Sequence, residues 1–427
     1  MKLTFRTPPK GTIRAIPSKS AAHRMLICAC FADTPSFIQC PSTSADIDAT
    51  VRCLCALGAG IVRTETGFSV TPVCRESLPQ NPVLDCGESG STLRFLLPVV
   101  AALGCGAQFV RHGRLAQRPL SPLYEELIRC GVTLPDDPTA EPLVMQGKLS
   151  AGAFTLAADV SSQFISGLLM AMPLMQGDCT LTLTGKVESA DYIRITTSVM
   201  KQFGAAPEIC DGERMYSMSN ASYCSPASAE VEGDWSNAAL WLVMGAIGEY
   251  PITVTGLRPD SPQGDRRITE ILASFGAGVC WEKDAVTVSP APLHGIRIDA
   301  SPIPDLVPVM AAAAAAAQGE TVISGIARLR LKESDRAAAV TEMLSALGAD
   351  IVCGTEEMVI RGGKTRAGAT VSSYNDHRMV MCAAAASLIA DGEVTVTGAQ
   401  AIDKSYPGFT ADFTAMGGAC ICTEELV

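Results

Sequence analysis

The stretch CLCALGAGIVRTETGFSVTP, residues 53–72, sets a pattern that returns throughout the chain. A helical pattern ends in glycine, and an apolar strand, a turn and a second strand follow. The same order recurs in ILASFGAGVCWEKDAVTVSP (271–290) and MLSALGADIVCGTEEMVIRG (343–362). Weaker copies occupy residues 127–145, 199–218 and 414–427.

The spacing of these copies is nearly constant. Their glycines are Gly58, Gly131, Gly204, Gly276, Gly348 and Gly417, so successive spacings are 73, 73, 72, 72 and 69 residues. A fixed period of this length is typical of a repeated supersecondary unit. The sequence therefore predicts six copies of one unit, each with a glycine at the C-terminal end of a helix.

Each copy also holds a second, alanine-rich helix with almost no polar face. These helices are expected within residues 18–32, 87–103, 159–175, 233–247, 303–317 and 374–390. A helix that is apolar all round is a buried helix. With strand patterns such as CTLTLTG and EVTVTG between the helices, the unit reads as strand, helix, strand pair, helix. Six such units predict two α/β domains of three repeats each, divided near residue 230.

Composition limits the possible functions. The chain has 427 residues, is 48% hydrophobic and carries a formal net charge of −11, which argues against nonspecific binding of nucleic acid. It has 17 cysteines without a C-x-x-C motif and four histidines, so a zinc site has weak support. Most of the cysteines read as small buried hydrophobes in a reducing compartment. The N-terminus lacks an apolar leader and no stretch suits a membrane span, so a cytoplasmic protein is expected.

Polar residues gather at two recurring places, the starts of the alanine-rich helices and the loops before the glycine-ended helices. RLRLKESDRA, residues 328–337, has the highest density of charge among them. Helix N-termini attract phosphate and carboxylate groups. Each residue alone has an ordinary explanation, since serines cap helices and a buried arginine often pairs with an acid. The recurrence of cations at equivalent positions of the repeat favours a binding site for a small anion.

The motifs PSKSAAHR, GESGSTLR, AQRPL, VSSQF, IPD, RLKESDR, YNDHRM and DKSYP resemble, in order and spacing, those of the 5-enolpyruvylshikimate-3-phosphate synthase family. The resemblance covers essentially the whole chain. It implies an inverse α/β prism of two three-repeat domains, residues 16–230 and residues 1–15 plus 231–427, with the active site in the interdomain cleft. It also implies a cytoplasmic monomer without metal or cofactor, acting in chorismate and aromatic amino acid biosynthesis.

The family transfers the enolpyruvyl group of phosphoenolpyruvate to the 5-hydroxyl of shikimate 3-phosphate, by addition and then elimination of phosphate. The resemblance implies that Asp305 accepts the hydroxyl proton, that Glu333 handles the methylene proton and that Lys19 assists. The implied shikimate 3-phosphate ligands are Lys19, Ser20, Arg24, Ser161, Ser162, Gln163, Ser189, Tyr192, Asp305 and Lys332. The implied phosphoenolpyruvate ligands are Lys19, Gly90, Arg118, Gln163, Arg336, Arg378 and Lys404. Glyphosate, which inhibits the family, is expected to occupy the phosphoenolpyruvate pocket.

Two alternatives and one departure accompany this interpretation. The related enolpyruvyl transferase that acts on UDP-N-acetylglucosamine shares the fold, but the Ser161–Gln163 set and LKESDR favour the shikimate enzyme. A repeat protein that has lost catalysis is disfavoured by the joint presence of Asp305, Glu333 and Lys19. Glu88 stands where the family often has asparagine, and it would repel an anionic substrate unless a cation such as Arg114 pairs with it.

Overall fold

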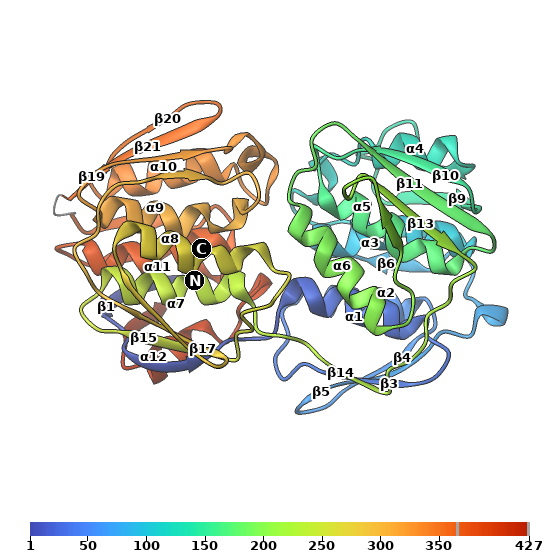
Figure 1. Ribbon diagram of the computed structural model, residues 1–427, viewed down its shortest axis with the longest axis horizontal. Helices are drawn as coiled ribbons and strands as arrows, with labels where there is room; N and C mark the ends of the chain where they lie inside the picture. The colour runs from blue at the N-terminus through green and yellow to red at the C-terminus, as the bar shows by residue number, and fades with distance from the viewer. Residues whose placement is uncertain (364–366, 425–427) are drawn as a thin grey trace. The chain divides into compact units, whose positions relative to one another are not determined.

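The computed structural model describes residues 1–363 and 367–424. The chain divides into two compact units: unit 1 comprises Met1–Ile16 and Glu232–Val427, and unit 2 comprises Pro17–Val231. Each unit has its own apolar core. The chain therefore leaves unit 1 after its first strands, builds all of unit 2, and returns to complete unit 1 (Figure 1).

Unit 2 contains three four-stranded sheets. Their strand orders are β14(Ser228–Glu230)-β3(Ser36–Gln39)-β5(Gly67–Thr71)-β4(Gly60–Arg63), β6(Val83–Asp85)-β7(Ala107–Val110)-β9(Leu143–Gly147)-β8(Val132–Thr133) and β10(Ala153–Ala157)-β11(Asp178–Thr184)-β13(Met215–Ser219)-β12(Glu208–Cys210). In each sheet the first two strands are parallel and the remaining neighbours antiparallel.

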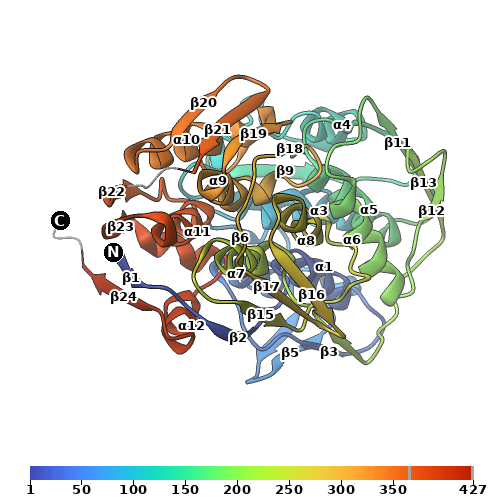
Figure 2. The same ribbon diagram turned by 60° about the vertical axis from the view of Figure 1, so that its left-hand side comes forward.

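Unit 1 repeats this topology in three more sheets. Their orders are β2(Gly11–Arg14)-β15(Ile252–Thr255)-β17(Ala285–Ser289)-β16(Gly278–Glu282), β18(Arg297–Asp299)-β19(Gly319–Ser324)-β21(Glu357–Gly362)-β20(Asp350–Cys353) and β22(Ala369–Ser372)-β23(Val394–Thr397)-β1(Lys2–Thr7)-β24(Ala419–Thr423). Two of them take in a strand from the start of the chain: β1 lies between β23 and β24, and β2 pairs with β15 (Figure 2).

Two sets of helices connect these strands. The inner set is α1(Lys19–Cys30), α3(Gly90–Leu103), α5(Ser162–Ala171), α7(Trp235–Ile247), α9(Val307–Ala316) and α11(His377–Ala386). The outer set is α2(Ala45–Ala56), α4(Leu123–Arg129), α6(Ala190–Gln202), α8(Ile268–Phe275), α10(Arg336–Ala346) and α12(Phe409–Ala415). Short 3₁₀ turns occupy η1(Arg75–Ser77), η2(Leu115–Gln117), η3(Met172–Leu174), η4(Gly264–Arg267), η5(Pro304–Leu306), η6(Ala327–Leu331), η7(Ser387–Ile389) and η8(Ala399–Lys404).

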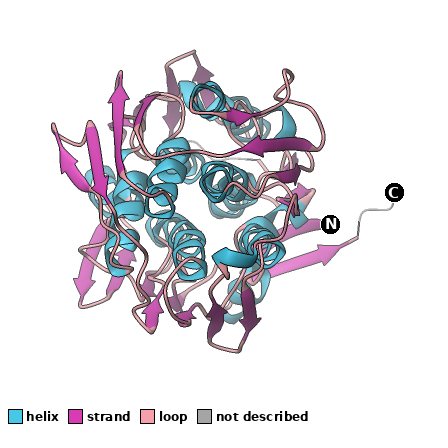
Figure 3. Ribbon diagram, turned by 90° about the vertical axis from the view of Figure 1, so that its right-hand side faces the viewer, coloured by secondary structure: helices cyan, strands magenta, loops and turns pink. Residues whose placement is uncertain are grey.

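The inner helices form the centre of each unit. In unit 1, α7, α9 and α11 contact one another, and in unit 2, α5 contacts α1 and α3. Every residue of α11 is buried, as are nine of the ten residues of α9. Figure 3 shows helices in cyan with strands in magenta around them. The prediction of fully buried alanine-rich helices is confirmed, and the small alanine side chains let their backbones pack closely.

The six repeat glycines lie where an L-residue would be strained. Their φ angles run from +72° at Gly204 to +108° at Gly276. Each follows an outer helix and lets the chain reverse into the next strand. The predicted repeat is thus confirmed, with one omission: the sequence pattern missed the parallel strand that precedes each inner helix. Strands such as β6, β14 and β18 have three residues each, too few to show a two-residue alternation.

The cysteines correct one expectation. All 17 lie in described residues and are free thiols, but eight are buried, so the interpretation that most are buried is wrong. Five of the others lie on the outermost antiparallel strands: Cys210, Cys280, Cys353, Cys420 and Cys422. Successive side chains of a strand point to opposite faces, so an apolar-looking strand at the border of a sheet still presents residues to solvent.

No helix within 1–363 and 367–424 has both the length and the hydrophobicity needed to cross a bilayer. No three histidine, cysteine, aspartate or glutamate side chains in those ranges gather as metal ligands would.

Gly167 controls how closely α3 and α5 pack. A Cβ built there would lie 2.5 Å from Arg94 O and 2.9 Å from Pro98 Cγ. Pro98 has no N–H to give Arg94 O, and Gly167 lets α5 approach this gap in the α3 hydrogen-bond ladder. We expect Gly167→Ala to destabilise the protein by about 1–3 kcal/mol through overpacking.

Chemical denaturation of both variants, monitored by near-ultraviolet circular dichroism, measures this difference. Gly354→Ala is the matched control, because its Cβ would lie at an ordinary 3.4 Å from Glu357 O. We expect it to change stability by less than about 0.5 kcal/mol. Equal effects of the two substitutions would contradict the packing explanation.

Candidate active site

The polar residues of both units lie where the inner helices begin. Side chains cap the N-termini of α1, α3, α5, α7 and α11: Ser18, Ser89, Ser161, Asp234 and Asp376. The helix α9 instead follows η5, which contains Asp305. Because the helix bodies are buried and apolar, their first turns are the places where charged groups collect.

Arg336 is the centre of the charged cluster in unit 1. It opens α10, its side chain is 2% exposed, and three carboxylates surround it. Its Nη1 donates to Asp305 Oδ1 at 2.6 Å and its Nη2 to Glu333 Oε2 at 2.7 Å. Its Nε donates to Asp376 Oδ2 at 2.8 Å. Burial alone would lower the pKa of Arg336, but the three carboxylates raise it, so the guanidinium stays charged.

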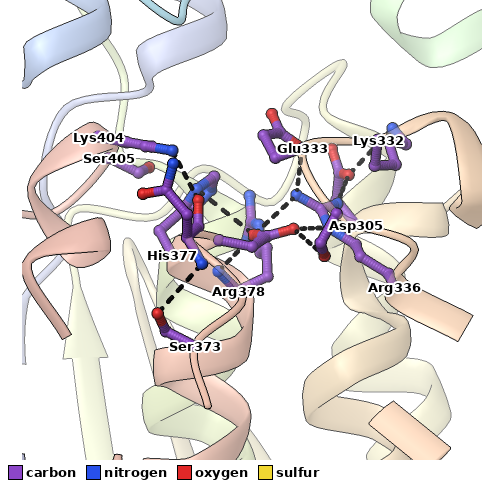
Figure 4. Close-up of polar contacts among 12 residues, drawn as sticks. Asp305, Lys332, Glu333, Arg336, Ser373, His377, Arg378, Lys404 and Ser405 are labelled. Carbon is purple, nitrogen blue, oxygen red and sulfur yellow. Dashed lines mark hydrogen bonds and ion pairs between the residues drawn. The ribbon is translucent and has the colours of Figure 1, made fainter. Parts of the chain in front are cut away.

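Lys332 and Glu333 flank this arginine, as Figure 4 shows. Lys332 Nζ lies 3.1 Å from Asp305 Oδ1, so Asp305 joins two cations. Burial lowers the pKa of Lys332, and Asp305 opposes that effect. The structure thus gathers Asp305, Lys332, Glu333 and Arg336 into one hydrogen-bonded group. Asp305 lies in η5, 27 to 31 residues before the other three, which belong to the LKESDR segment.

Arg378 lies in the first turn of α11 and is 5% exposed. Ser236, in the first turn of α7, accepts hydrogen bonds from both terminal nitrogens of Arg378. Nη1 donates to the Ser236 carbonyl at 2.8 Å, and Nη2 donates to Ser236 Oγ at 2.5 Å. Asp376 ties the same helix to Arg336. The starts of α7 and α11 and the LKESDR loop are therefore held together by buried polar contacts.

The segment before α11 has an unusual backbone. Tyr374 and Asn375 both have positive φ, 53° and 55°, a conformation that costs non-glycine residues free energy. Lys404 at the end of η8 donates to the carbonyl of Asn375 at 2.6 Å. Figure 4 shows Lys404 and Arg378 on the same side of the cluster. The strained turn thus brings a carbonyl to Lys404 immediately before the helix that carries Arg378.

In unit 2, Lys19 and Arg24 belong to α1 but differ in setting. Lys19 Nζ forms a 2.8 Å ion pair with Asp46 Oδ2, and its side chain is 16% exposed. Arg24 is 2% exposed, and four of its five N–H donors reach protein acceptors, among them Thr196 Oγ1 and the Ser20 carbonyl. Lys19 can therefore meet a ligand more directly than Arg24, which mainly joins α1 to α6.

Gln163 is held between two helices. Its Oε1 accepts from Arg94 Nη1 at 2.8 Å, and its Nε2 donates to Ser91 Oγ at 2.9 Å. Arg94 Nη2 also donates to the carbonyl of Pro119, in the loop that carries Arg118. These contacts join the starts of α3 and α5, which explains why a buried arginine lies on an apolar helix.

Gly90 and Arg118 are direct neighbours. A Cβ at Gly90 would lie 2.6 Å from Arg118 Nη1 and 3.0 Å from its Cζ. The guanidinium thus lies against the N-terminus of α3, where a larger residue would displace it. Glu88 turns instead toward Gly113, whose Cβ would lie 2.8 Å from the Glu88 carboxyl carbon.

The serines form a partly buried group. Ser161 is the N-cap of α5, Ser162 is its first residue, and both are less than 10% exposed. Ser189 precedes α6 with φ of +55°, again a left-handed non-glycine residue. Tyr192 follows it, and its carbonyl accepts from Arg24 Nη2 at 3.2 Å. These helix starts combine hydroxyls with exposed N–H groups, a setting suited to a phosphate.

A buried polar chain supports the start of α3. His23 Nδ1 lies 2.7 Å from Thr50 Oγ1, which lies 2.7 Å from Thr92 Oγ1. Thr92 Oγ1 donates to the N-cap Ser89 Oγ at 2.8 Å. His23 Nε2 has no hydrogen-bond partner within the described residues. His23 is therefore linked to the α3 N-terminus through three hydroxyl groups.

Three important residues were not predicted from the sequence: Asp46, Ser236 and Asp265. Arg94 and Asp376 belong to the polar residues expected at the helix starts, but no substrate role was predicted for them. Asp376 and Arg94 do lie within motifs used for the family resemblance. Asp46, Ser236 and Asp265 carry no such signal, because their partners are 27, 142 and 29 residues away in the chain.

A family model described as EPSP synthase (3-phosphoshikimate 1-carboxyvinyltransferase) matches residues 4–413. Curated proteins called 3-phosphoshikimate 1-carboxyvinyltransferase from Clostridium kluyveri and Methanocorpusculum labreanum are 38% and 36% identical to the chain. The match to the Clostridium kluyveri protein covers 98% of both chains. The match to the Methanocorpusculum labreanum protein covers 98% of this chain and 99% of that one. The fold resembles EPSP synthase from Acinetobacter baumannii, with a TM-score of 0.81 at 22% identity over 99% of this chain and 100% of that one. The enolpyruvyl transferase NikO from Streptomyces tendae gives 0.78 at 18% identity over 98% of each.

The imidazole of His23 should stay neutral throughout the pH range in which the protein is folded. Burial lowers the pKa of His23 far below its usual value, and the positive charges of Lys19 and Arg24 lower it further. The unfolded chain binds this proton near pH 6.5, so the stability that neutral His23 contributes is present above that pH and is lost progressively below it.

Histidine ¹⁵N chemical shifts recorded between pH 8 and 5 test this expectation. His23→Asn, which can still bond to Thr50, identifies the His23 signals by their loss. A midpoint for His23 near 6.5 would show that the buried polar chain admits a proton, contrary to its geometry.

Proposed function

The chain belongs to the EPSP synthase family, the 3-phosphoshikimate 1-carboxyvinyltransferases, and from this premise we propose how its residues divide the work of the reaction. The enzyme transfers the enolpyruvyl group of phosphoenolpyruvate to the 5-hydroxyl of shikimate 3-phosphate, giving 5-enolpyruvylshikimate 3-phosphate and phosphate. The observation that carries the assignment of roles is the cluster in which Arg336 bonds to both Asp305 and Glu333.

Shikimate 3-phosphate is the acceptor substrate in this proposal. Its phosphate is held by Ser161, Ser162 and Ser189, supported by the hydroxyls and helix N–H groups at the starts of α5 and α6. The remaining ligands in the proposal are Lys19, Ser20, Arg24, Gln163, Tyr192, Asp305 and Lys332. The contribution of Arg24 is mainly to position Ser20 and Tyr192, because it donates to the carbonyls of both.

In this proposal the ligands of phosphoenolpyruvate are mainly cations. The proposed ligands are Lys19, Gly90, Arg118, Gln163, Arg336, Arg378 and Lys404. Arginine and lysine suit the carboxylate and phosphate of this substrate, and they suit the anionic ketal phosphate that forms after addition. The close contact of Arg118 with Gly90 supports a pocket in which the backbone at the start of α3 lies against the substrate.

The two carboxylates divide the proton transfers. Asp305 removes the proton of the 5-hydroxyl while the hydroxyl oxygen bonds to C2 of phosphoenolpyruvate. Glu333 gives a proton to the methylene carbon. In elimination Glu333 takes a proton back from the methyl group, the C2–O bond to phosphate breaks, and the leaving phosphate takes up the proton held by Asp305. An anion that binds Arg336 competes with Glu333 for its Nη2, which favours the protonated form that Glu333 needs as an acid.

We also propose the setting in which the enzyme works. The free thiols of all 17 cysteines support a reducing cytoplasm, and the net charge of −11 supports a protein that does not bind nucleic acid. The family resemblance supports a monomer. The proposed phosphate-binding serines Ser161, Ser162 and Ser189 belong to unit 2, and Asp305 and Glu333 belong to unit 1.

Phosphate release tests the function directly. The purified protein should release phosphate when phosphoenolpyruvate and shikimate 3-phosphate are both present, and mass spectrometry should detect the enolpyruvyl product. Replacement of the acceptor by UDP-N-acetylglucosamine should abolish release. Turnover of the nucleotide sugar instead would favour the related transferase, and no turnover with either acceptor would favour a non-catalytic binding protein.

Glu333→Gln should lower kcat by about 100-fold or more, because the amide keeps the shape but cannot donate or accept the methylene proton. The KM values for both substrates should change little. Ser334→Ala is a neighbouring control, since Ser334 bonds to Asp376 and takes no part in proton transfer. Steady-state kinetics measure both variants, and unchanged turnover of Glu333→Gln would remove Glu333 from the mechanism.

Gly90→Ala should weaken glyphosate more than phosphoenolpyruvate. The new Cβ must displace the Arg118 guanidinium, so the KM for phosphoenolpyruvate should rise several-fold. Glyphosate is bulkier at this place, so its inhibition constant should rise by a larger factor. Gly87→Ala is the control: its φ is +57°, but the nearest atom to its Cβ is 3.7 Å away, so it adds backbone strain without intrusion. Equal changes in both constants for Gly90→Ala would refute the steric explanation.

A further inference from the structure

Asp265 is a buried acid that the reaction described above does not use. It lies in η4 and is 4% exposed. Its Oδ2 accepts a hydrogen bond from Ser236 Oγ, and its Oδ1 has no partner among the residues that the structure describes. A buried carboxylate with an unsatisfied oxygen is costly to fold, so its presence calls for a compensating role.

The hydroxyl of Ser236 gives this contact a direction. Ser236 Oγ accepts from Arg378 Nη2, and its one proton goes to Asp265. The Ser236 carbonyl accepts from Arg378 Nη1 at 2.8 Å. The order of donation is therefore Arg378 to Ser236 to Asp265, and two points of attachment fix the plane of the guanidinium.

Arg378 keeps one edge without a hydrogen-bond partner among the described residues. Ser236 occupies one N–H of each terminal nitrogen, while the buried Nε has no hydrogen-bond partner in the described part of the chain. A guanidinium presents five N–H groups in a rigid fork, so its Nε side can still meet a carboxylate or phosphate with two parallel bonds. The orientation of that edge depends on what holds the opposite side.

We propose that Ser236 and Asp265 are positioning residues that lock Arg378 in the orientation that receives the anionic group of phosphoenolpyruvate. The proposal rests on the proposed function, since it takes Arg378 as a ligand of this substrate. Neither residue touches the substrate. Without the pair, a free arginine side chain must lose its rotamer freedom when the anion binds, which weakens binding.

The charges around Asp265 give the pair a second property. Asp305 on η5 and Asp234 at the start of α7 repel it, while Arg378 on α11 attracts it. Burial raises the pKa of Asp265 to about 7, Asp305 adds to the rise, and Arg378 and Ser236 oppose it. An anion bound at Arg378 adds negative potential and raises this pKa further, so binding and proton uptake by Asp265 favour each other.

Kinetics of three variants test the positioning role. Asp265→Ala and Ser236→Ala should each raise the KM for phosphoenolpyruvate about tenfold, with kcat and the KM for shikimate 3-phosphate within about twofold. Asp265→Asn should restore most of the loss, because its amide oxygen can accept from Ser236 in the same geometry. If Asp265→Asn is as poor as Asp265→Ala, or if neither alters this KM, the positioning role is refuted.

Two controls separate this role from general structural damage. Glu232→Gln changes another largely buried acid of unit 1 whose pKa burial also raises, but whose partners are Ser261 and Gln263. It should leave the KM for phosphoenolpyruvate unchanged. Asp265→Asn should unfold at the wild-type temperature or above, because it removes a buried charge. A lower melting temperature together with a lower kcat and higher KM values for both substrates would mark Asp265 as a structural residue and overturn the proposal.

Arg378→Ala separates failure of the inference from failure of the proposed function. If it leaves the KM for phosphoenolpyruvate unchanged, Arg378 is not a ligand and the proposed function is wrong at this residue. If it raises the KM while the Asp265 variants do not, the inference alone fails. Residues that act in series are non-additive, so Arg378→Ala combined with Asp265→Ala should be no worse than Arg378→Ala alone.

The pH dependence provides a readout that a structural role would not move. The ratio of the KM for phosphoenolpyruvate in wild type to that in Asp265→Asn should be smallest at pH 6 and rise through pH 7 to pH 8. The ionisation of the substrate occurs with both proteins and cancels in this ratio. A ratio that stays flat across this range would refute the link between Asp265 and the bound anion.

Discussion

The inner helices have no polar face, and this constraint determines where chemistry can occur. A body such as α11, buried at every residue, cannot hold a charge along its length. Its first turn is different, because the free N–H groups and the positive end of the helix dipole face the next polar group. Many of the functional candidates, such as Ser161, Arg336 and Arg378, therefore begin helices or directly precede them, because the apolar packing that stabilises each unit disfavours charges deeper in the inner helices.

Charges at such positions must be oriented before a ligand arrives. Arg336 is held by three carboxylates, Arg378 by Ser236, and Arg94 by a carbonyl and Gln163. Each guanidinium has lost its freedom during folding, so binding of an anion does not incur that cost again. Preorganised dipoles and charges of this kind stabilise developing charge more effectively than mobile ones.

The sequence predicted those parts of the fold that depend on two properties: glycine adopts a positive φ without strain, and an alanine-rich helix without a polar face is buried. Gly276 indicates a left-handed turn, and the alanines from 311 to 317 indicate a buried helix. The period of the repeat and the inner helices could therefore both be predicted from the sequence. The short strand β14 has no such signal, and its place beside β3 depends on a contact across almost 200 residues. Asp265 reads as an ordinary loop acid until the fold brings Ser236 and Arg378 to it.

The N-terminal strand β1 has a consequence for how the protein is made. Its partners β23 and β24 lie far along the chain, whereas unit 2 is complete once residue 231 has left the ribosome. At about 5–20 residues per second, the stretch Glu232–Val427 takes about 10 to 40 s to synthesise. Throughout that interval the nascent chain carries a finished unit and an unpaired strand, so β1 can pair with its partners only after unit 2 has been made.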